Sequence, residues 1–360
     1  MVISFGQHLR ELPGPVLLTG HTGFKGTWMT FLLEHLNVPV VGYSLPPEKD
    51  SLFDRADRLG RIPELLADIR DYDALAKFIN LHKPSTIIHM AAQPLVLKSY
   101  QNPRETFDVN VMGAVNVLDI AFKKDFVKTL IVVTTDKVYR NDNSGRAFVE
   151  SDPLEGKDPY SASKVGTEAV VSAWQQIERI SCGPKVVSVR AGNVIGGGDF
   201  AKNRIIPDLV RGAISKRAVE VRNPRSTRPW QHVLDPLVGY LKLVEKLLTG
   251  HSFTSVNFGP NTESTSVSEV VKISQMHFPS IEILIPADQK REFESTRLDL
   301  NSDYSVRSLD WSTGWNQENA IHKTFIWWKN YLQLNKSPEE LCSMDIYERL
   351  QLGDVKNEGK

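Results

Sequence analysis

The sequence predicts an α/β fold in which a doubly wound parallel sheet is followed by a smaller C-terminal part. Three observations support this prediction. An apolar run near the N-terminus leads through a glycine-rich turn into helical spacing, apolar runs alternate with helical patterns up to about residue 190, and beyond that point the alternation loosens. Such alternation implies right-handed strand–helix–strand units, which place helices on both faces of a parallel sheet.

The predicted elements of the first part follow one another in a regular order. The first strand, 15–18, precedes a helix in which Trp28, Phe31, Leu32 and Leu36 recur at helical spacing. The later predicted strands are 38–43, 86–90, 130–134 and 186–190. The predicted helices between them are 72–81, 103–123 and 162–179.

The glycine-rich turn reads Thr-Gly-His-Thr-Gly-Phe-Lys-Gly over residues 19–26. Gly20, Gly23 and Gly26 allow a tight turn and a close approach to a pyrophosphate, whose charge then lies at the N-terminus of the next helix. The segment therefore predicts a Rossmann-type dinucleotide-binding site. Because glycine turns before helices are common, the motif becomes specific only together with a second one downstream.

We expect the dinucleotide-binding part to cover residues 1–190 and to carry the catalytic residues. A substrate-binding part is expected at 191–335, with exchange of segments between the two parts allowed. It begins with a glycine loop at 196–198 and a helix that has Pro207 in its first turn. Residues 336–360 are expected to form a polar tail.

The composition excludes several classes of protein. The 43 Lys and Arg residues balance 43 Asp and Glu residues, so no overall charge attracts nucleic acid or an acidic membrane. Cys182 and Cys342 lie far apart and make no metal-binding or redox motif. No signal peptide and no apolar run of about 18 residues is present. We therefore expect a cytoplasmic protein that needs no metal and binds neither nucleic acid nor membrane.

Tyr160 and Lys164 form the second motif. On a helix they share one face, about 6 Å apart along the axis. A free tyrosine has a pKa of about 10, and a nearby ammonium group is expected to lower it by stabilising the phenolate. The phenolate can take a proton from a sugar hydroxyl while a hydride leaves the same carbon for a nicotinamide. The alternative, an exposed helix that carries the two residues by chance, is disfavoured by the glycine turn upstream.

The whole arrangement resembles the nucleotide-sugar branch of the extended short-chain dehydrogenases/reductases over nearly the full chain. Residues 134–139, Thr-Thr-Asp-Lys-Val-Tyr, lie where the 4,6-dehydratases of that branch carry Thr-Asp-Glu at the end of a strand. Epimerases of the same fold lack this acid–base pair. Thr135 and Asp136 match the dehydratase pattern, and Lys137 departs from it.

The lysine, the turn at 19–26 and the segment Arg-Pro-Trp-Gln-His-Val at 228–233 are together similar to the family members that act on CDP-glucose. The resemblance implies a hydro-lyase that converts CDP-glucose to CDP-4-keto-6-deoxyglucose and water. The product feeds 3,6-dideoxyhexose units of the O-antigen of bacterial lipopolysaccharide.

The resemblance also implies a role for each catalytic residue. Tyr160, with Lys164, is the base at C4, Thr135 hydrogen-bonds the sugar, Asp136 is the acid at C6, and Lys137 takes the position of the base at C5. A lysine base needs its pKa, about 10.4 when free, to fall by roughly three units, and we expect burial and nearby positive charges to lower it. Alternatively, Lys137 stays charged and stabilises the enolate while another group takes the proton.

The cofactor implied by the resemblance is NAD, which is regenerated in each cycle. The positions implied to hold it are Gly20, Thr22, Gly23, Phe24, Lys25, Gly26, Asp68, Ile69, Ala91, Gln93, Asn110, Thr134, Tyr160 and Lys164. NADP is the alternative, because no acidic residue follows the second strand and because Lys49 and Arg55 lie nearby. His89, at the end of a strand, is expected to be a buried histidine with a polar partner.

Asn193, Asn203, Arg228 and Trp230 are the expected substrate-binding residues. Asn203 and Arg228 are candidates for the pyrophosphate, since planar guanidinium groups suit phosphate oxygens. For Trp230, stacking on the nucleotide and packing in the core fit the sequence equally well. Nothing in these side chains selects cytosine, so dTDP-glucose and GDP-mannose are alternative substrates.

Two other functions compete with the dehydratase. An epimerase or dehydrogenase of the same fold oxidises C4 without releasing water, and Asp136 with Lys137 argues against it. A non-catalytic NAD-binding regulator has no need of Tyr160 and Lys164. The resemblance further implies a homodimer or higher homo-oligomer, assembled through exposed faces of the helices near 103–123 and 162–179.

Overall fold

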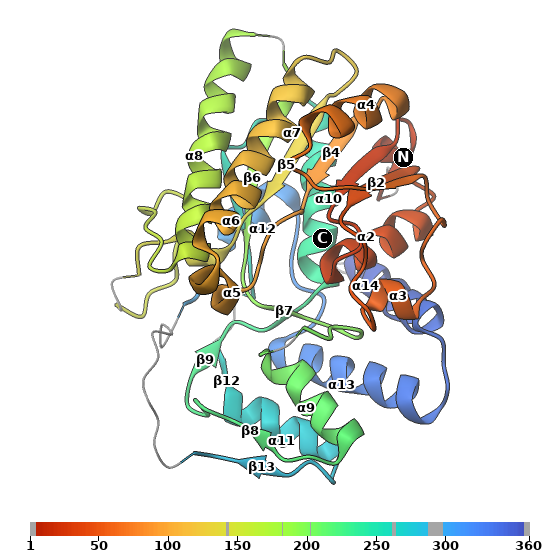
Figure 1. The fold of residues 1–360 in the computed structure, drawn as a ribbon, viewed down its shortest axis with the longest axis vertical. Helices are drawn as coiled ribbons and strands as arrows, with labels where there is room; N and C mark the ends of the chain where they lie inside the picture. The colour runs from red at the N-terminus through yellow and green to blue at the C-terminus, as the bar shows by residue number, and fades with distance from the viewer. Residues whose placement is uncertain are drawn as a thin grey trace.

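The central feature of the molecule is a parallel sheet of seven strands (Figure 1). The computed structural model describes residues 5–141, 144–181, 183–201, 203–260, 264–286 and 298–355. The strand order across the sheet is β11-β6-β5-β4-β1-β2-β3. The strands are β1 (Val16–Thr19), β2 (Val40–Ser44), β3 (Glu64–Leu66), β4 (Thr86–His89), β5 (Thr129–Val133), β6 (Lys185–Ala191) and β11 (Ser255–Phe258).

The chain builds this sheet outward from β1 in both directions. It proceeds from β1 to β2 and β3 on one side, then returns to β4 on the other side of β1. The order therefore reverses between β1 and β4, and a doubly wound sheet binds ligands at the carboxyl ends of the strands at such a point. The predicted doubly wound α/β fold is confirmed.

Helices cover both faces of the sheet, as Figure 1 shows. Leu17 and Leu18 point to opposite faces and belong to different core clusters, as neighbouring strand residues must. The first cluster packs the sheet against α2 (Phe24–His35) and α10 (Leu234–Leu248). The second packs it against α4 (Tyr72–His82), α7 (Gly113–Phe122) and α8 (Pro159–Ile180).

The helix predicted over 103–123 contains an irregular turn. It consists of α6 (Pro103–Phe107), the π-helical turn η1 (Asp108–Met112) and α7. A π turn inserted in an α-helix frequently marks a functional site, because it redirects one side chain. Here the buried side chain of that turn is Asn110.

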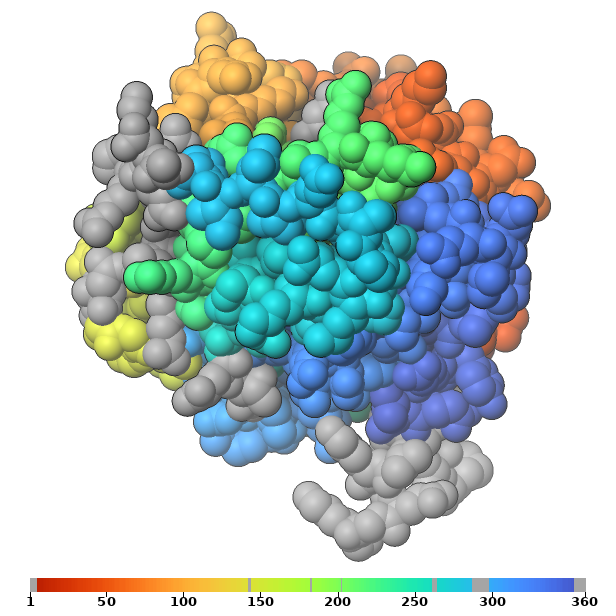
Figure 2. Space-filling model, turned by 90° about the horizontal axis from the view of Figure 1, so that it is seen from below, coloured from red at the N-terminus to blue at the C-terminus, as the bar shows by residue number. Residues whose placement is uncertain are grey.

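The second part of the molecule lies below the sheet in Figure 1. Its strands pair two by two: β7 (Val194–Ile195) with β10 (Gln231–His232), β9 (Thr227–Arg228) with β12 (Thr265–Ser266), and β8 (Val219–Glu220) with β13 (Ile283–Leu284). Its helices are α9 (Ile205–Ser215), α11 (Val267–His277) and α13 (Gln317–Gln333). Figure 2, seen from below, shows the green and cyan segments lying beside the blue C-terminal segment.

The remaining elements are short helices that connect or flank the others. They are α1 (Gln7–Arg10), α3 (Leu52–Arg55), α5 (Val96–Gln101), the 3₁₀ turn η2 (Asp136–Val138) and α12 (Asp303–Leu309). Within the described residues, no helix combines the length and the apolar character needed to cross a membrane.

The two parts of the chain are interlaced. Both α10 and β11 lie beyond residue 190 in sequence. Nevertheless, α10 packs against one face of the sheet, and β11 pairs with β6 to become the edge strand. The loop after β7 also joins the two parts, because the main-chain oxygen of Gly197 accepts from Nε1 of Trp28 in α2 at 3.1 Å. A Cβ on Gly197 would lie 1.9 Å from the ring of Trp327 in α13, so this close approach requires glycine.

The segment expected to be a polar tail contains a docked helix, α14 (Pro338–Val355), so the tail prediction is wrong for these residues. Leu341, Cys342 and Ile346 are buried in the main core cluster. Arg349 of this helix donates to the buried carboxylate of Asp235 at 2.5 Å. Only a few apolar residues of α14 pack against the core. The polar composition of the segment therefore did not predict a packed helix. Cys182 lies outside the described residues, and Cys342 is a free thiol.

Candidate active site

The segment 134–139, which follows β5, is shaped by Thr135. The Thr135 hydroxyl accepts a hydrogen bond from the main-chain nitrogen of Lys137 at 3.4 Å and donates to Asp136 at 3.0 Å. These contacts cap the short turn η2. They place the Asp136 carboxyl inside the protein and the Lys137 side chain at the surface.

The start of α8 fixes the position of Tyr160. Asp158 accepts a hydrogen bond from the main-chain nitrogen of Ser161 at 2.9 Å, and Pro159 occupies the first helical position. This capping box determines where the helix begins. Tyr160 therefore lies in the first turn and Lys164 one turn later, and both side chains are buried.

Burial dominates the ionisation of Tyr160 and Asp136. It raises the pKa of Tyr160 to about 12, and a hydrogen bond with Thr135 acts in the opposite direction. The prediction of a lowered tyrosine pKa is therefore wrong for this structure. Burial also raises the pKa of Asp136, against the positive charge of Lys137. A carboxyl whose protonated form is favoured suits the role of an acid.

Two lysines, the buried Lys164 and the half-buried Lys25, lie close to these groups. Burial, followed by the charge of Lys25, lowers the pKa of Lys164 to about 8. Burial lowers the pKa of Lys25 to about 8 as well, while the charge of Asp136 raises it. Lys25 comes from the glycine turn, yet its ammonium group interacts with Asp136, so its side chain reaches the catalytic residues. Its nitrogen also donates to Tyr240 at 3.4 Å.

Lys137 differs from expectation. Its side chain is exposed, so the burial that we expected around it is wrong. The reason is the turn η2, which turns Asp136 inward and Lys137 outward on consecutive residues.

The glycine turn has the geometry of a phosphate-binding loop. Gly20 has a φ of 78°, and a Cβ there would lie 2.8 Å from the main-chain nitrogen of Ala91. A Cβ on Gly26 would lie 2.1 Å from the oxygen of Gly20. Helix α2 starts at Gly23 with no side-chain cap, so the main-chain N–H groups of its first turn are not used by a cap. Phe24, the first residue of α2, is half-buried.

At the end of β2, where the dinucleotide-binding fold commonly has an acidic residue, this chain has hydroxyl groups. The Thr22 hydroxyl contacts that of Ser44 at 2.7 Å and donates to the oxygen of Leu45 at 2.9 Å. Arg55, which we considered for a 2′-phosphate, is already engaged. It donates to Tyr331 at 2.9 Å, and its guanidinium lies 4.3 Å from the ring centre of Phe200.

Asn110 connects the loop after β4 with the catalytic helix. Its side chain accepts from the main-chain nitrogen of Gln93 at 2.8 Å and donates to the Ser163 hydroxyl at 2.8 Å. Ser163 in turn donates to the main-chain oxygen of Tyr160 at 2.7 Å. His89, at the end of β4, shares a hydrogen bond of 2.7 Å with Thr19 and is buried, as predicted.

The remaining cofactor candidates are Asp68 and Ile69, which follow β3, and Thr134, which follows β5. Asp68 pairs with Arg70 at 2.6 Å, and this hydrogen bond lowers the pKa of Asp68. Ile69 is buried against Gly113. The Thr134 hydroxyl does not point to open space, because it donates to Glu168 at 2.5 Å.

The four expected substrate-binding residues of the second part differ in burial and in their distance from the catalytic candidates. Arg228 lies close enough to Asp136 for its charge to act on that carboxyl. Asn193 is half-buried, and its main-chain oxygen accepts from Gln231 at 3.2 Å. Asn203 is exposed, with a φ of 62°. Trp230 is buried in the main core and donates to the oxygen of Thr265 at 3.1 Å, which favours packing over stacking.

Sequence reasoning missed Arg204, which starts α9. Its charge lowers the pKa of both Lys25 and Tyr160, so its guanidinium lies near enough to act on them. It also forms an ion pair with Asp199 at 3.1 Å. The sequence favours the adjacent Asn203 as the substrate-binding residue. Only the course of the chain into α9 shows which of the two lies nearer to Lys25 and Tyr160.

Comparison with known proteins agrees with this geometry. The model of the NAD dependent epimerase/dehydratase family matches residues 16–259. The chain belongs to this family.

Relatives of the family align along nearly the whole chain. The CDP-glucose 4,6-dehydratase of Salmonella typhimurium is 37% identical over 328 residues, which cover 88% of this chain and 91% of the relative. A dTDP-glucose 4,6-dehydratase of Bacillus anthracis, solved in complex with NAD, superposes with a TM-score of 0.73 at 21% identity, covering 91% of this chain and 99% of its own. A UDP-glucose 4-epimerase of Stenotrophomonas maltophila with bound NAD gives 0.78 at 18% identity, covering 90% and 100%.

Membership in an NAD-dependent family confirms the choice of NAD over NADP. The site fits this cofactor on its own evidence. Gly20 and Gly26 leave no room for a Cβ, the first turn of α2 is free of a side-chain cap, and Arg55 is engaged elsewhere.

Proposed function

We propose that the protein is a CDP-glucose 4,6-dehydratase, which converts CDP-glucose to CDP-4-keto-6-deoxyglucose and water. The observation that carries the proposal is the placement of Asp136 and Lys137 in the turn beside Thr135 and Tyr160. The 37% identity to the Salmonella typhimurium enzyme over 88% of the chain supports it independently. A 4-epimerase needs Tyr160 but not the acid–base pair.

Oxidation at C4 depends on α8. Tyr160 takes the proton of the C4 hydroxyl, and the ammonium group of Lys164, one turn later, stabilises the phenolate. Thr135 holds the same hydroxyl, since it already hydrogen-bonds with the tyrosine. NAD, when bound, would supply the acceptor for the C4 hydride and its donor to C6, so the conversion would consume no cofactor.

Elimination of water depends on the segment 134–139. The C4 ketone acidifies the C5 proton. Lys137 either removes this proton or, staying charged, stabilises the enolate while another group takes the proton. Asp136 donates its proton to the C6 hydroxyl, which leaves as water. After the hydride has returned to C6, C5 regains a proton and the 4-keto-6-deoxy sugar is complete. Burial raises the pKa of Asp136 and so favours the protonated form that this step requires.

Substrate binding is assigned to the second part of the chain. Arg228 and Arg204 carry charges that act on the catalytic groups, and guanidinium groups suit the pyrophosphate of a nucleotide sugar. Asn193 and Asn203 lie on the loops next to them. In this proposal, residues 1–190 form the NAD-binding part, extended by α10 and β11, and residues 191–335 bind the substrate.

We also propose that the protein is a cytoplasmic homodimer or higher homo-oligomer. Large apolar side chains are exposed on the helices expected at the interface: Phe107, Met112, Ile177 and Ile180. Ile180 is 88% exposed. Exposed apolar side chains on these helices are suited to isologous packing against a second copy.

Mass spectrometry of products tests the proposal. The purified protein is incubated separately with CDP-glucose, dTDP-glucose, UDP-glucose and GDP-mannose. A product lighter by one water from CDP-glucose is the expected result. A product of unchanged mass indicates an epimerase, preference for another nucleotide changes the substrate, and absence of turnover with all four contradicts the enzyme assignment.

A further inference from the structure

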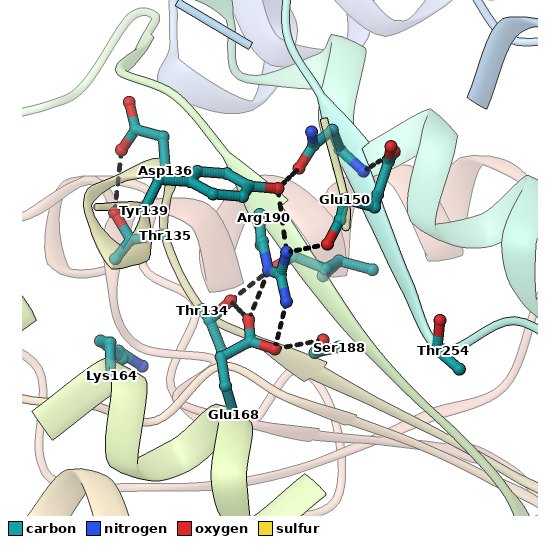
Figure 3. A network of polar contacts seen from close by, with 12 residues as sticks. Thr134, Thr135, Asp136, Tyr139, Glu150, Lys164, Glu168, Ser188, Arg190 and Thr254 are labelled. Carbon is teal, nitrogen blue, oxygen red and sulfur yellow. Dashed lines mark hydrogen bonds and ion pairs between the residues drawn. The ribbon is translucent and has the colours of Figure 1, made fainter. Parts of the chain in front are cut away.

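The segment 134–139 is attached at both ends to one buried ion pair, Glu168 with Arg190 (Figure 3). Both side chains are about 5% exposed. The reaction described above uses neither of them. Their contacts nevertheless reach the first and the last residue of the segment that carries Asp136.

Glu168 holds the first residue. One carboxylate oxygen accepts from the Thr134 hydroxyl at 2.5 Å and from Nε of Arg190 at 2.9 Å. The other accepts from the Ser188 hydroxyl at 2.7 Å and from Nη2 of Arg190 at 2.9 Å. The two parallel bonds to Arg190 fix the orientation of the carboxylate.

Arg190 holds the last residue. Its Nη1 donates to the Tyr139 hydroxyl at 2.9 Å and to the main-chain oxygen of Glu150 at 3.0 Å. The Tyr139 hydroxyl then donates to Asn257 at 2.7 Å. The Tyr139 ring stacks on Phe148, with ring centres 5.1 Å apart.

Glu168 also belongs to the helix that presents the C4 base. Tyr160, Lys164 and Glu168 are spaced by four residues on α8, so they follow one face of the helix. The ion pair therefore connects the helix that carries Tyr160 with both ends of the segment that carries Asp136.

Resting on the proposed function, we propose that Glu168 and Arg190 are positioning residues that fix the distance between Asp136 and Tyr160 by holding Thr134 and Tyr139. The C4 and C6 hydroxyls belong to one bound sugar, so the two groups that act on them must be held at a matching distance from each other. A displacement of about 1 Å of a catalytic group can cost about 100-fold in rate.

Removal of Glu168 or Arg190 itself would leave an unpaired buried charge and can prevent folding. The test therefore uses their partners. Thr134→Val and Tyr139→Phe each remove one hydroxyl that anchors the segment. Ser188→Ala is the matched control, because it removes one hydroxyl from the same carboxylate without touching the segment.

We expect Thr134→Val and Tyr139→Phe to lower kcat with CDP-glucose by roughly 10- to 100-fold while KM changes less than about threefold. Ser188→Ala keeps kcat within about twofold, and Thr134→Ser, which keeps the hydroxyl, restores it. Equal losses in all three hydroxyl-deletion variants, in line with their thermal stability, would show a purely structural role. Unchanged kcat in Thr134→Val overturns the proposal.

Amide hydrogen exchange separates this proposal from the proposed function. In the free protein, Thr134→Val and Tyr139→Phe should speed exchange at residues 135–139 at least tenfold, and Ser188→Ala should not. If the wild-type protein is inactive on CDP-glucose but exchange changes as stated, the function is wrong and the anchoring holds. If exchange is unchanged in all variants, the anchoring itself is refuted.

Discussion

Lys164 donates a hydrogen bond from its Nζ to the main-chain oxygen of Val133, 3.0 Å away. The contact joins the middle of the catalytic face of α8 to the last residue of β5, immediately before the segment 134–139. The Lys164 ammonium group is thus held by the strand that leads into Asp136. Burial raises the pKa of both Tyr160 and Asp136.

Tyr160→Phe should lower kcat by about 10²- to 10⁴-fold, the usual effect of losing a general base, with little change in substrate affinity. The phenol acts on a proton, whereas binding energy comes largely from nucleotide and phosphates. Steady-state kinetics with CDP-glucose measure both quantities. Tyr100→Phe, which alters a phenol that is 54% exposed, serves as the control. Near-normal turnover of Tyr160→Phe would remove the tyrosine from the mechanism.

Asp136→Asn should spare oxidation at C4 and slow the loss of water. The amide keeps the size of the side chain but has no acidic proton for the C6 hydroxyl. Reduced cofactor should then accumulate after rapid mixing with CDP-glucose, visible as a transient absorbance that the wild type does not show. Loss of this first hydride transfer in a folded variant would place Asp136 in the oxidation step instead.

Lys137→Met should spare oxidation at C4 and stop exchange of the C5 proton with deuterated solvent, because no base remains to remove it. Lys137→Arg distinguishes the two roles considered for this residue. Arginine keeps the positive charge but does not act as a base at neutral pH. Exchange in the arginine variant would favour stabilisation of the enolate by charge, and its absence would favour proton abstraction by the lysine.

Activity should fall at alkaline pH as Lys164, whose pKa is about 8, loses its proton and no longer stabilises the phenolate. The charge of Lys25 lowers that pKa, so Lys25→Met should raise it. The alkaline midpoint of the kcat profile is expected to move upward by roughly one pH unit, equivalent to about 1.4 kcal/mol. Lys77→Met, which removes an exposed charge on α4, should leave the midpoint in place. A downward shift with Lys25→Met would contradict the interaction.

The docking of α14 should depend on pH through Asp345. Burial raises its pKa from 3.8 to about 6, so the protonated form is favoured in the folded state. The stabilisation is complete below pH 4 and is lost as the pH rises through about 6. Asp345→Asn should therefore increase the free energy of unfolding at pH 8, by at most about 3 kcal/mol, and have little effect at pH 4. Chemical denaturation at both pH values measures this, with the exposed Glu339→Gln as control. A destabilised variant at pH 8 would show that the ion pair with Lys323 outweighs burial.

The sequence was informative wherever local chemistry fixes local structure. The glycines of 19–26, the strand that ends before Thr134 and the spacing of Tyr160 and Lys164 predicted the sheet, the turn before α2 and the helix that carries both residues. These features act within a few residues of one another. They do not depend on how distant segments pack.

The remainder depends on packing between distant segments. The tyrosine pKa was predicted in the wrong direction because the extent of burial is a tertiary property. Arg204 was missed because its neighbour Asn203 is equally polar, and only the course of α9 separates them. Glu168 and Arg190 could not be identified as a pair from the sequence. Glu168 is an ordinary helix residue, and the presence of Arg190 in a buried strand is explained only by its partner on another element.

The position of β11 has a consequence for folding of the chain during its synthesis on the ribosome. A nascent chain from which only the residues up to 191 have left the exit tunnel has β6 as its last strand, with a row of unsatisfied main-chain groups along its edge. That edge is covered only when residues 255–258 have been synthesised and have left the exit tunnel. For the time needed to add more than sixty residues, the emerging sheet offers a template for pairing with another nascent chain, and chaperone protection during this interval would limit such aggregation.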